Sequence, residues 1–304
     1  MNNVIIGIDN SNSYRVHLAI TTELVEEARK CHDTTPLATA GLGRVLTGAG
    51  LMAVQLKDEK NVLTLQFKGD GPAKQILATA NGRGEVKGFI SNPDVDMPLK
   101  PNGKLDVGGS LGIGELTVIK DLGLKEPYNG TIALVSGEIA DDLTAYYFIS
   151  EQQNTSIALG VKVDRDYSVL AAGGMFIQML PNACEEAIFE LEKMLDKMPP
   201  LTTLIEEVTN ENMGLTEEGL LQRLMEHIFR DIKEEYMPKK FGESKIMWQC
   251  DCDRNRIKNV LKSIGRKELK AIIEEDGQAE LTCRFCETEY NFDKNELETI
   301  LSEI

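Results

Sequence analysis

The sequence predicts an α+β protein: a strand-rich N-terminal domain with inserted helices, a helical linker, and a small C-terminal domain that carries most of the cysteines. Short apolar runs separated by turn residues fill residues 1–181. Amphipathic helical patterns fill the acidic segment 182–243, and four of the six cysteines lie in residues 244–304. Strands with occasional helices, instead of a regular alternation of the two, are typical of the α+β class. A length of 304 residues is typical of more than one domain.

The first domain is predicted mainly from hairpin patterns. The runs VIIGID and YRVHLAI flank the turn residues NSNS, and QILATANGRGEVKGFISNP reads as two strands around an NGRG turn. The stretches KLDVGGSLGIGELTVIKDLG and TSIALGVKVDRDYSVLAAGGMFIQML indicate further hairpins. We interpret GGSLGIG at 108–114 as a bend or bulge within a strand pair.

Two helices are predicted to interrupt these strands. One covers TTPLATAGLGRVLTGAGLMAVQL, with Thr35 as its N-cap and Pro36 at its first position. The other covers IADDLTAYYFISEQ. His17 alternates with apolar neighbours, so we place it on the polar face of a strand. Cys31 and Cys184 are isolated, and the sequence assigns them no role beyond packing or surface positions.

The linker, 182–243, combines helical periodicity with a large negative charge. CEEAIFELEKMLDKM is amphipathic and ends at Pro199, and LTEEGLLQRLMEHIFRDIKEEY forms a second amphipathic helix with Thr216 as a possible cap. The segment holds 15 acidic and 7 basic residues, half of the chain's net charge of −16. It is either a solvated helical linker or a segment close to its folding threshold, because like charges weaken compact structure.

The C-terminal domain, 244–304, contains two helical stretches, RIKNVLKSIG and RKELKAIIEED, then AELTCRFCETEYNFD and a final helix NELETILSEI. Two cysteine motifs frame this domain: CDC, with Cys250 and Cys252, and CRFC, with Cys283 and Cys286. Four thiolates match the tetrahedral preference of zinc, and a site with four cysteine ligands is structural because no position is left for water. The spacing therefore predicts one zinc ion. His227, on a helix, is not needed to complete this ligand set.

Three other readings of the cysteines remain open at this point. Two local disulfides fit a secreted protein, but the N-terminus shows no signal-peptide pattern. A thiol-disulfide oxidoreductase needs only one cysteine pair, and its CxxC is expected to open a helix. A zinc ribbon that binds nucleic acid would use the basic side chains of this domain, which are balanced by nearby acids. These basic residues are Arg254, Arg256, Lys258, Lys262, Arg266, Lys267 and Lys270.

A comparison of free energies indicates that metal binding contributes more to the stability of this domain than its apolar core does. A core from 61 residues with few aromatics contributes about 3–5 kcal/mol. A structural zinc site contributes roughly 10–16 kcal/mol at neutral pH. We therefore expect the domain to unfold without zinc. Zinc-bound sulfurs are thiolates, the form that oxidants attack, so the spacing also permits a redox switch.

Composition excludes several function classes. A net charge of −16 repels polyanions such as DNA and RNA on average, so we expect no nucleic-acid partner. The apolar stretches are too short to span a bilayer, so no membrane partner is expected. No G-x-x-x-x-G-K-[ST] motif is present, and we predict no enzymatic activity. The default location is the cytoplasm, where thiols stay reduced.

The residues resemble a known family over nearly the whole chain: the redox-regulated molecular chaperones called 33 kDa chaperonin, or heat shock protein 33 homologue. The resemblance is carried by GDGP, KLDVGGSLGIGELTVIKDLG, YNGTIALVSGEIADDLTAYYFISEQ, AAGGMFIQMLPNA, CDCDRNRI and CRFCETEYNFD. The chain differs from the common family pattern at Asn154, where proline is common, and at Asp253 and Trp248, where serine and phenylalanine are frequent. No ligand is lost by these differences, but they leave the oxidant threshold open.

The resemblance implies a cytoplasmic, ATP-independent holdase that binds unfolding proteins under oxidative stress. It implies that the reduced, zinc-bound form is inactive, with Cys250, Cys252, Cys283 and Cys286 as ligands. Oxidation would form the disulfides Cys250–Cys252 and Cys283–Cys286, release zinc, and unfold the C-terminal domain and the linker 182–243. The active form would be a homodimer that holds aggregation-prone clients.

Overall fold

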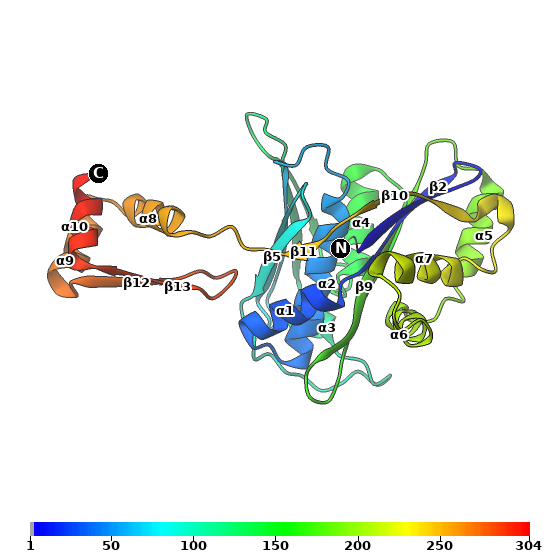
Figure 1. The fold of residues 1–304 in the computed structure, drawn as a ribbon, viewed down its shortest axis with the longest axis horizontal. Helices are drawn as coiled ribbons and strands as arrows, with labels where there is room; N and C mark the ends of the chain where they lie inside the picture. The colour runs from blue at the N-terminus through cyan, green and yellow to red at the C-terminus, as the bar shows by residue number, and fades with distance from the viewer. Residues whose placement is uncertain (1–2) are drawn as a thin grey trace. The chain divides into compact units, whose positions relative to one another are not determined.

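The computed structural model describes residues 3–304, which form two compact units, one reaching to Trp248 and one spanning Gln249–Ile304. Figure 1 labels many of its helices and strands, and each unit is described by itself. The mixed α+β class is confirmed, with most strands in the first unit and the four-cysteine region in the second. The predicted division at 1–181, 182–243 and 244–304 stays a prediction about which segments behave as domains.

Two antiparallel sheets dominate the first unit. The first sheet has the order β10-β1-β2-β9-β8, with bounds β10 Pro238–Ser244, β1 Val4–Asp9, β2 Tyr14–Ile20, β9 Val169–Met179 and β8 Thr155–Val163. The second has the order β11-β5-β4-β3-β6-β7, with bounds β11 Met247–Trp248, β5 Glu85–Ile90, β4 Gln75–Asn81, β3 Val62–Gly69, β6 Gly114–Asp121 and β7 Tyr128–Ala133. Only the short β11 runs parallel to its neighbour, β5.

Helix α2, Pro36–Ala53, packs against strands of both sheets and is buried almost all round. Its small residues permit this close packing: a Cβ added at Gly50 would lie 2.6 Å from Ile246. The predicted cap is confirmed, since the Thr35 hydroxyl accepts from the amide of Ala38 and Pro36 is the first helical residue. The larger apolar core of the first unit surrounds this helix.

Four further helical elements belong to this part of the chain: α1 Thr22–His32, α3 Val107–Leu111, α4 Ala140–Tyr146 and the π-helix η1 Tyr147–Glu151. The helix predicted from IADDLTAYYFISEQ is thus confirmed, whereas α1 was not expected. Reading 108–114 as a bend within a strand pair was wrong, because 107–111 are helical and only Gly114 enters β6. The turn between them uses Gly112 at a φ of 71°.

The interpretation of His17 as a polar-face residue was also wrong. Its side chain is buried, and its ring lies 5.9 Å from that of Phe176. The reason is topological: β2 lies in the interior of its sheet between β1 and β9, and both faces of that sheet are covered. Alternation along a strand marks a solvent face only where one face of the sheet is open.

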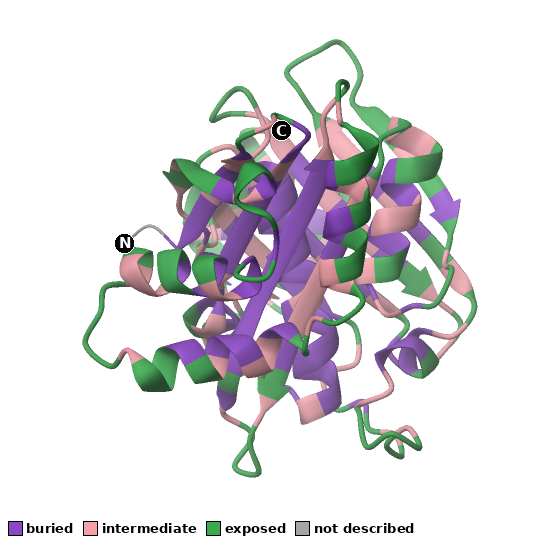
Figure 2. Ribbon diagram, turned by 90° about the vertical axis from the view of Figure 1, so that its right-hand side faces the viewer, coloured by how far each residue is buried: buried purple, intermediate pink, exposed green. Residues whose placement is uncertain are grey.

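The linker segment folds into α5 Glu185–Leu195, α6 Leu201–Glu211, α7 Glu217–Ile228 and the short 3-10 helix η2 Glu234–Tyr236. The Thr216 cap is confirmed by its bond from the amide of Gly219. Helix α6 packs on β8 and β9, and α7 on β1 and β2. Their buried residues join one face of the first sheet in a second core, which we call the linker core. In Figure 2 these helices are buried on one side and exposed on the other.

The second unit is small. It comprises α8 Arg254–Ser263, α9 Arg266–Glu275, the hairpin β12 Gln278–Thr282 with β13 Glu289–Asp293, and α10 Lys294–Ser302. The three helices were expected from the sequence, and the hairpin lies in the AELTCRFCETEYNFD stretch. Its buried core consists of Leu261, Leu269, Ile273, Phe292, Leu297 and Ile300. A core of this size is marginal for 56 residues.

Candidate metal centre

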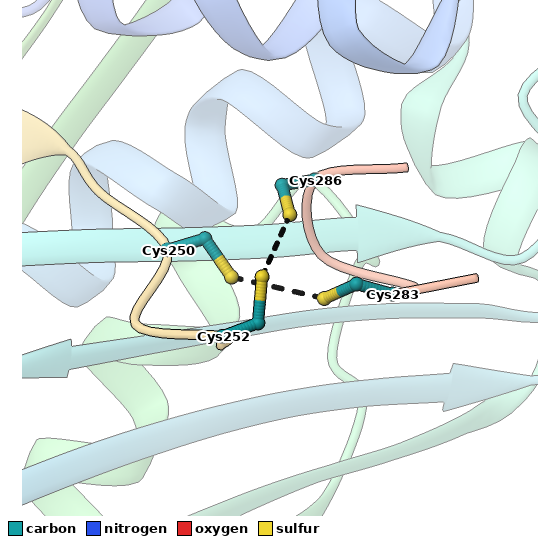
Figure 3. Close-up of side chains that lie close together, drawn as sticks. All are labelled: Cys250, Cys252, Cys283 and Cys286. Atoms are coloured by element: carbon teal, nitrogen blue, oxygen red, sulfur yellow. Dashed lines mark hydrogen bonds between the residues drawn. The ribbon is translucent and has the colours of Figure 1, made fainter. Parts of the chain in front are cut away.

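The four cysteines of the second unit come from two loops. Cys250 and Cys252 lie in the stretch that precedes α8, whose N-cap Asp253 accepts from the amide of Arg256. Cys283 and Cys286 lie in the turn that joins β12 and β13. Sequence spacing alone could not show that the two loops meet, and the fold brings them together (Figure 3).

The sulfur geometry fits a tetrahedral metal ion. All four Sγ atoms lie within 4.8 Å of one another. The Sγ atoms of Cys250 and Cys283 are 3.7 Å apart, and those of Cys252 and Cys286 are 3.2 Å apart. Sulfurs each about 2.3 Å from a tetrahedral zinc ion lie about 3.8 Å from one another. The set can therefore hold a metal ion with only small adjustments.

The turn that carries Cys283 and Cys286 is fixed by its own backbone. The amide of Glu287 donates to the carbonyl of Cys283 at 2.8 Å, and the amide of Cys283 donates to the carbonyl of Thr288 at 3.0 Å. Glu287 adopts a left-handed φ of 52°, which reverses the chain. Both sulfurs consequently project to the same side of the hairpin (Figure 3).

Two hydroxyl groups contact the sulfur cluster. Tyr290 donates its hydroxyl hydrogen to the Sγ of Cys252 at 3.2 Å, and the Thr288 hydroxyl lies 3.3 Å from the Sγ of Cys286. Such donors favour the ionised form of sulfur. The sequence alone assigns neither residue a role. Thr288 and Tyr290 follow Cys286 by two and four residues, and in an extended strand such positions lie on one face, which is the signal in the sequence that could have identified them.

The thiols differ in their acidity. Burial raises the pKa of Cys250, and the neighbouring sulfurs add to this rise. Burial also raises the pKa of Cys252, although the bond from Tyr290 opposes it. Burial acts on Cys286 in the same direction, but bonds from the hydroxyl and amide of Thr288 outweigh it and lower the pKa of Cys286 to about 7. Among Cys250, Cys252 and Cys286, only Cys286 has a pKa below its ordinary value.

The remaining candidate residues lie elsewhere. Within residues 3–304, this is the one group of three or more cysteine, histidine or carboxylate side chains that meets the geometry of a metal site. His227 lies on α7 in the first unit. Cys184 is the exposed N-cap of α5 and contacts the Ser13 hydroxyl at 3.6 Å, while Cys31 is half-buried in α1.

The basic side chains of the second unit are largely neutralised. Arg254 pairs with Glu296, Arg256 with Asp251, and Lys270 with Glu274. Lys258 and Lys262 both pair with Glu303 at 2.7 Å. A surface that binds a polyanion needs basic groups free to contact phosphates. These pairs argue against the nucleic-acid reading of the unit.

The CRFC motif also lacks the context of a dithiol oxidoreductase. Cys283 follows a strand, but the chain turns into β13 and opens no helix after it. A thioredoxin-like motif uses the start of a helix to lower the pKa of its first cysteine. The hairpin instead aims both sulfurs at the two from the other loop.

None of the helices within residues 3–304 combines the length and the apolar composition that a bilayer-spanning segment needs.

Comparisons with known proteins agree with the resemblance in the sequence. The family model described as Hsp33 protein matches residues 2–293. The 33 kDa chaperonin of Alkaliphilus oremlandii is 44% identical over 304 residues, covering 100% of this chain and 97% of that protein. The 33 kDa chaperonin of Desulforamulus reducens is 42% identical, covering 98% of this chain and 96% of that protein.

A solved structure supports the same assignment. The crystal structure of the 33 kDa chaperonin (heat shock protein 33 homologue) from Thermotoga maritima superposes with a TM-score of 0.84 at 36% identity, covering 99% of this chain and 98% of that chain. The family model, the relatives and this structure all extend over both units of the fold. The chain therefore belongs to the Hsp33 family of chaperones.

Proposed function

We propose that this chaperone is a redox-regulated, ATP-independent holdase that is inactive while reduced and zinc-bound. The observation that carries the proposal is the gathering of four sulfurs in a unit whose buried core has only six residues. A bound zinc ion would hold the four sulfurs as thiolates and cross-link the two loops that carry them. The stability of the unit then depends on the oxidation state of its sulfurs.

The switch requires two disulfides. We propose that Cys250 pairs with Cys252 and Cys283 with Cys286, as the family resemblance implies. Each disulfide forms when two thiolates together lose two electrons to one oxidant molecule. Peroxide accepts these electrons with two protons from the solvent and becomes two waters, whereas hypochlorite accepts them with two protons and becomes chloride and water. Disulfide sulfurs are poor metal ligands, so the oxidised loops can no longer hold the ion together.

The linker helices supply the proposed link between the switch and client binding. Helices α6 and α7 cover a sheet face formed by Ile5, Val16, Leu18 and their neighbours. These helices lie in a segment with a net charge of −8, which weakens their compact state. We propose that 182–243 loses order on oxidation and that the uncovered apolar surface holds unfolding clients.

We further propose that the protein works in the cytoplasm, dimerises in its oxidised form, catalyses no reaction, and binds neither nucleic acid nor membranes. The paired basic side chains of the second unit support the statement on nucleic acid. Sedimentation of the reduced and oxidised forms would test the dimer, since only the oxidised form should sediment as two chains.

The central experiment is an oxidant titration in which zinc release and aggregation suppression are followed in the same samples. We expect both to rise together, with no requirement for nucleotide. The proposal fails if oxidised, metal-free protein suppresses aggregation of a thermally unfolding client no better than the reduced zinc form. Salt-sensitive retention of the reduced protein on RNA, or turnover with small disulfides, would instead support the alternative functions.

A further inference from the structure

We propose that the outer edge of β1 is a strand-addition site, which an extended segment of a client occupies after β10 leaves it. This inference rests on the proposed holdase function and names how one class of client segment is recognised. In the reduced state β10 occupies the edge, running antiparallel to β1 from Val4 opposite Ser244 to Asp9 opposite Pro238 (Figure 1). The molecule itself therefore shows that a strand fits there.

The resident strand β10 is a poor side-chain partner for this edge. Its sequence PKKFGES offers Lys239, Gly242 and Glu243 opposite Ile8, Ile6 and Ile5. The register also slips between Ile6 and Gly7, and the skipped residue, Phe241, is 73% exposed. Apart from Pro238, the residues of β10 are exposed or only half-buried. Main-chain hydrogen bonds, and little apolar burial, consequently hold β10 in place.

The neighbouring strand, β1, is in contrast apolar and largely buried. In β1, Val4 and Ile5 are buried, and Ile5 belongs to the linker core together with Val16 and Leu18. An apolar strand with an open edge pairs readily with another extended chain. When β10 is removed from the sheet order, β1 becomes such an edge.

The linker helices help to keep β10 on this edge. At its start, the buried Tyr236 accepts a hydrogen bond on its carbonyl from the Tyr14 hydroxyl, and both residues belong to the linker core. Lys240 of β10 pairs with Glu218 on α7. Tyr236 and Glu218 both lie in the linker segment 182–243, so loss of order in that segment removes both anchors, and the strand then keeps mainly its backbone bonds.

The geometry also defines which segment fits. Residues directly opposite in an antiparallel pair share a face, so a segment with apolar side chains at alternate positions would extend the apolar face around Ile5. A Cβ at Gly7 would lie 3.1 Å from the Met225 sulfur, the Val16 side chain and Pro238. Departure of α7 and β10 removes Met225 and Pro238, leaving space beside Gly7 for a large apolar client side chain. The fitting partner is thus an extended apolar segment without proline, recognised through its backbone.

Hydrogen exchange on the full-length chain tests the proposal, with a thermally unfolded client as the probe. In the reduced protein we expect protection of both 4–9 and 238–244. After oxidation, exchange should accelerate in both segments. With client bound, 4–9 should regain protection while 238–244 stays in fast exchange. Protection of 4–9 that does not change on oxidation, or that returns only together with 238–244, would overturn the proposal.

A variant of the resident strand gives a second test. Gly242→Val places a β-branched side chain opposite Ile6, and the added Cβ would meet only the Ile6 Cδ1, at 3.8 Å. The better-matched strand should compete with client segments and weaken client holding about three-fold. Thr131→Val on β7, an edge strand of the other sheet, is the control and should leave client holding unchanged.

The two proposals fail differently. Loss of aggregation suppression in the oxidised wild-type protein contradicts the holdase function itself. Full suppression by the wild type, combined with equal suppression by Gly242→Val and persistent exchange at 4–9 in the client complex, leaves the holdase function in place and overturns the β1 site alone.

Discussion

Cys283 is the most buried of the four clustered cysteines, at 8% exposure. Replacement by serine removes a sulfur that could bind the metal and leaves a hydroxyl, which is a much weaker zinc ligand. Because loss of an outer-shell partner already weakens metal binding about 10–100-fold, we expect Cys283→Ser to lower zinc affinity by more than that. Competition with a metal-binding dye measures the change.

The matched control for this variant is Cys184→Ser, which alters an exposed thiol outside the cluster. It should bind zinc as tightly as the wild type. Equal zinc affinity of Cys283→Ser and Cys184→Ser would show that the cluster is not the metal site.

His17 makes the first unit sensitive to acid. Burial, and after it the nearby charge of Arg15, lowers the pKa of His17 to about 4 from an ordinary value of 6.5. The unfolded chain therefore binds the proton more readily, and stability falls as pH drops from about 6.5 to 4, by up to about 3 kcal/mol. His17→Leu should flatten this part of the profile. Urea unfolding of the first unit at several pH values measures it, and parallel profiles of the two proteins would contradict the assignment.

At the scale of helices and strands, sequence patterns identified elements whose local propensity agrees with their environment. The two helices of the second unit and the capped helix at Thr35 are examples. Helix α6 was missed because LTTLIEEVTNE is rich in β-branched residues, which favour helix weakly, and burial of Leu204 and Ile205 stabilises it instead. Strand β10 was missed because PKKFGES has little strand propensity and forms only through pairing with β1, more than 200 residues away.

A substitution in helix α7 tests whether the linker helices cover the apolar sheet face that is proposed to hold clients. Leu224 is fully buried in the linker core, so Leu224→Ala should cost about 2–5 kcal/mol. We expect the reduced, zinc-bound variant to suppress aggregation in part without oxidant. Leu215→Ala, which truncates a side chain that is 45% exposed just before α7, is the control and should stay inactive when reduced. If neither reduced variant suppresses aggregation, destabilising the linker does not by itself allow client binding, and the prediction is wrong.

The segment between β10 and β11 is held by hydrogen bonds to Asn3, the residue just before β1. The buried side chain of Asn3 accepts from the amide of Ile246 at 2.7 Å and donates to its carbonyl at 2.9 Å. Along the chain, Ile246 lies between the linker and the cysteines. Loss of order that starts at the cysteines must therefore break the Asn3–Ile246 hydrogen bonds before it reaches the linker. Asn3→Ala leaves two buried backbone groups unpaired, at about 1–3 kcal/mol each.

We therefore expect Asn3→Ala to activate faster than the wild type after one fixed oxidant dose. The emission of Trp248, the chain's single tryptophan, should shift earlier as well, because β11 follows Ile246 directly. Asn92→Ala removes a half-buried side chain that donates to the Pro72 carbonyl and serves as the control. Identical activation rates in the three proteins would show that Asn3 does not limit the transition.

At the scale of the whole molecule, the sequence identified the four clustered cysteines but not the side chains that contact their sulfurs. The CDC and CRFC spacing predicted which sulfurs could share an ion, because ligand spacing within a loop is a local property. The contacts of Tyr290 and Thr288 with the sulfurs depend on the register of the hairpin, which spacing does not specify. The two compact units also place the boundary at Trp248, because β11 pairs with β5 and joins the residues just before Gln249 to the first unit.

In the second unit, metal binding is expected to contribute more free energy of folding than the apolar core does, and this difference predicts how the molecule responds to chelation. A core of about 3–5 kcal/mol cannot replace roughly 10–16 kcal/mol of metal binding. Under anaerobic, reducing conditions, a zinc chelator should therefore bring exchange in 254–302 close to that of an unfolded chain, while 36–53 in the buried helix α2 stays protected. Added zinc should restore protection, and a calcium-selective chelator should have no effect. If 254–302 stays protected in metal-free protein, the second unit is stable without its ion, and oxidation of the sulfurs cannot act through the loss of that ion.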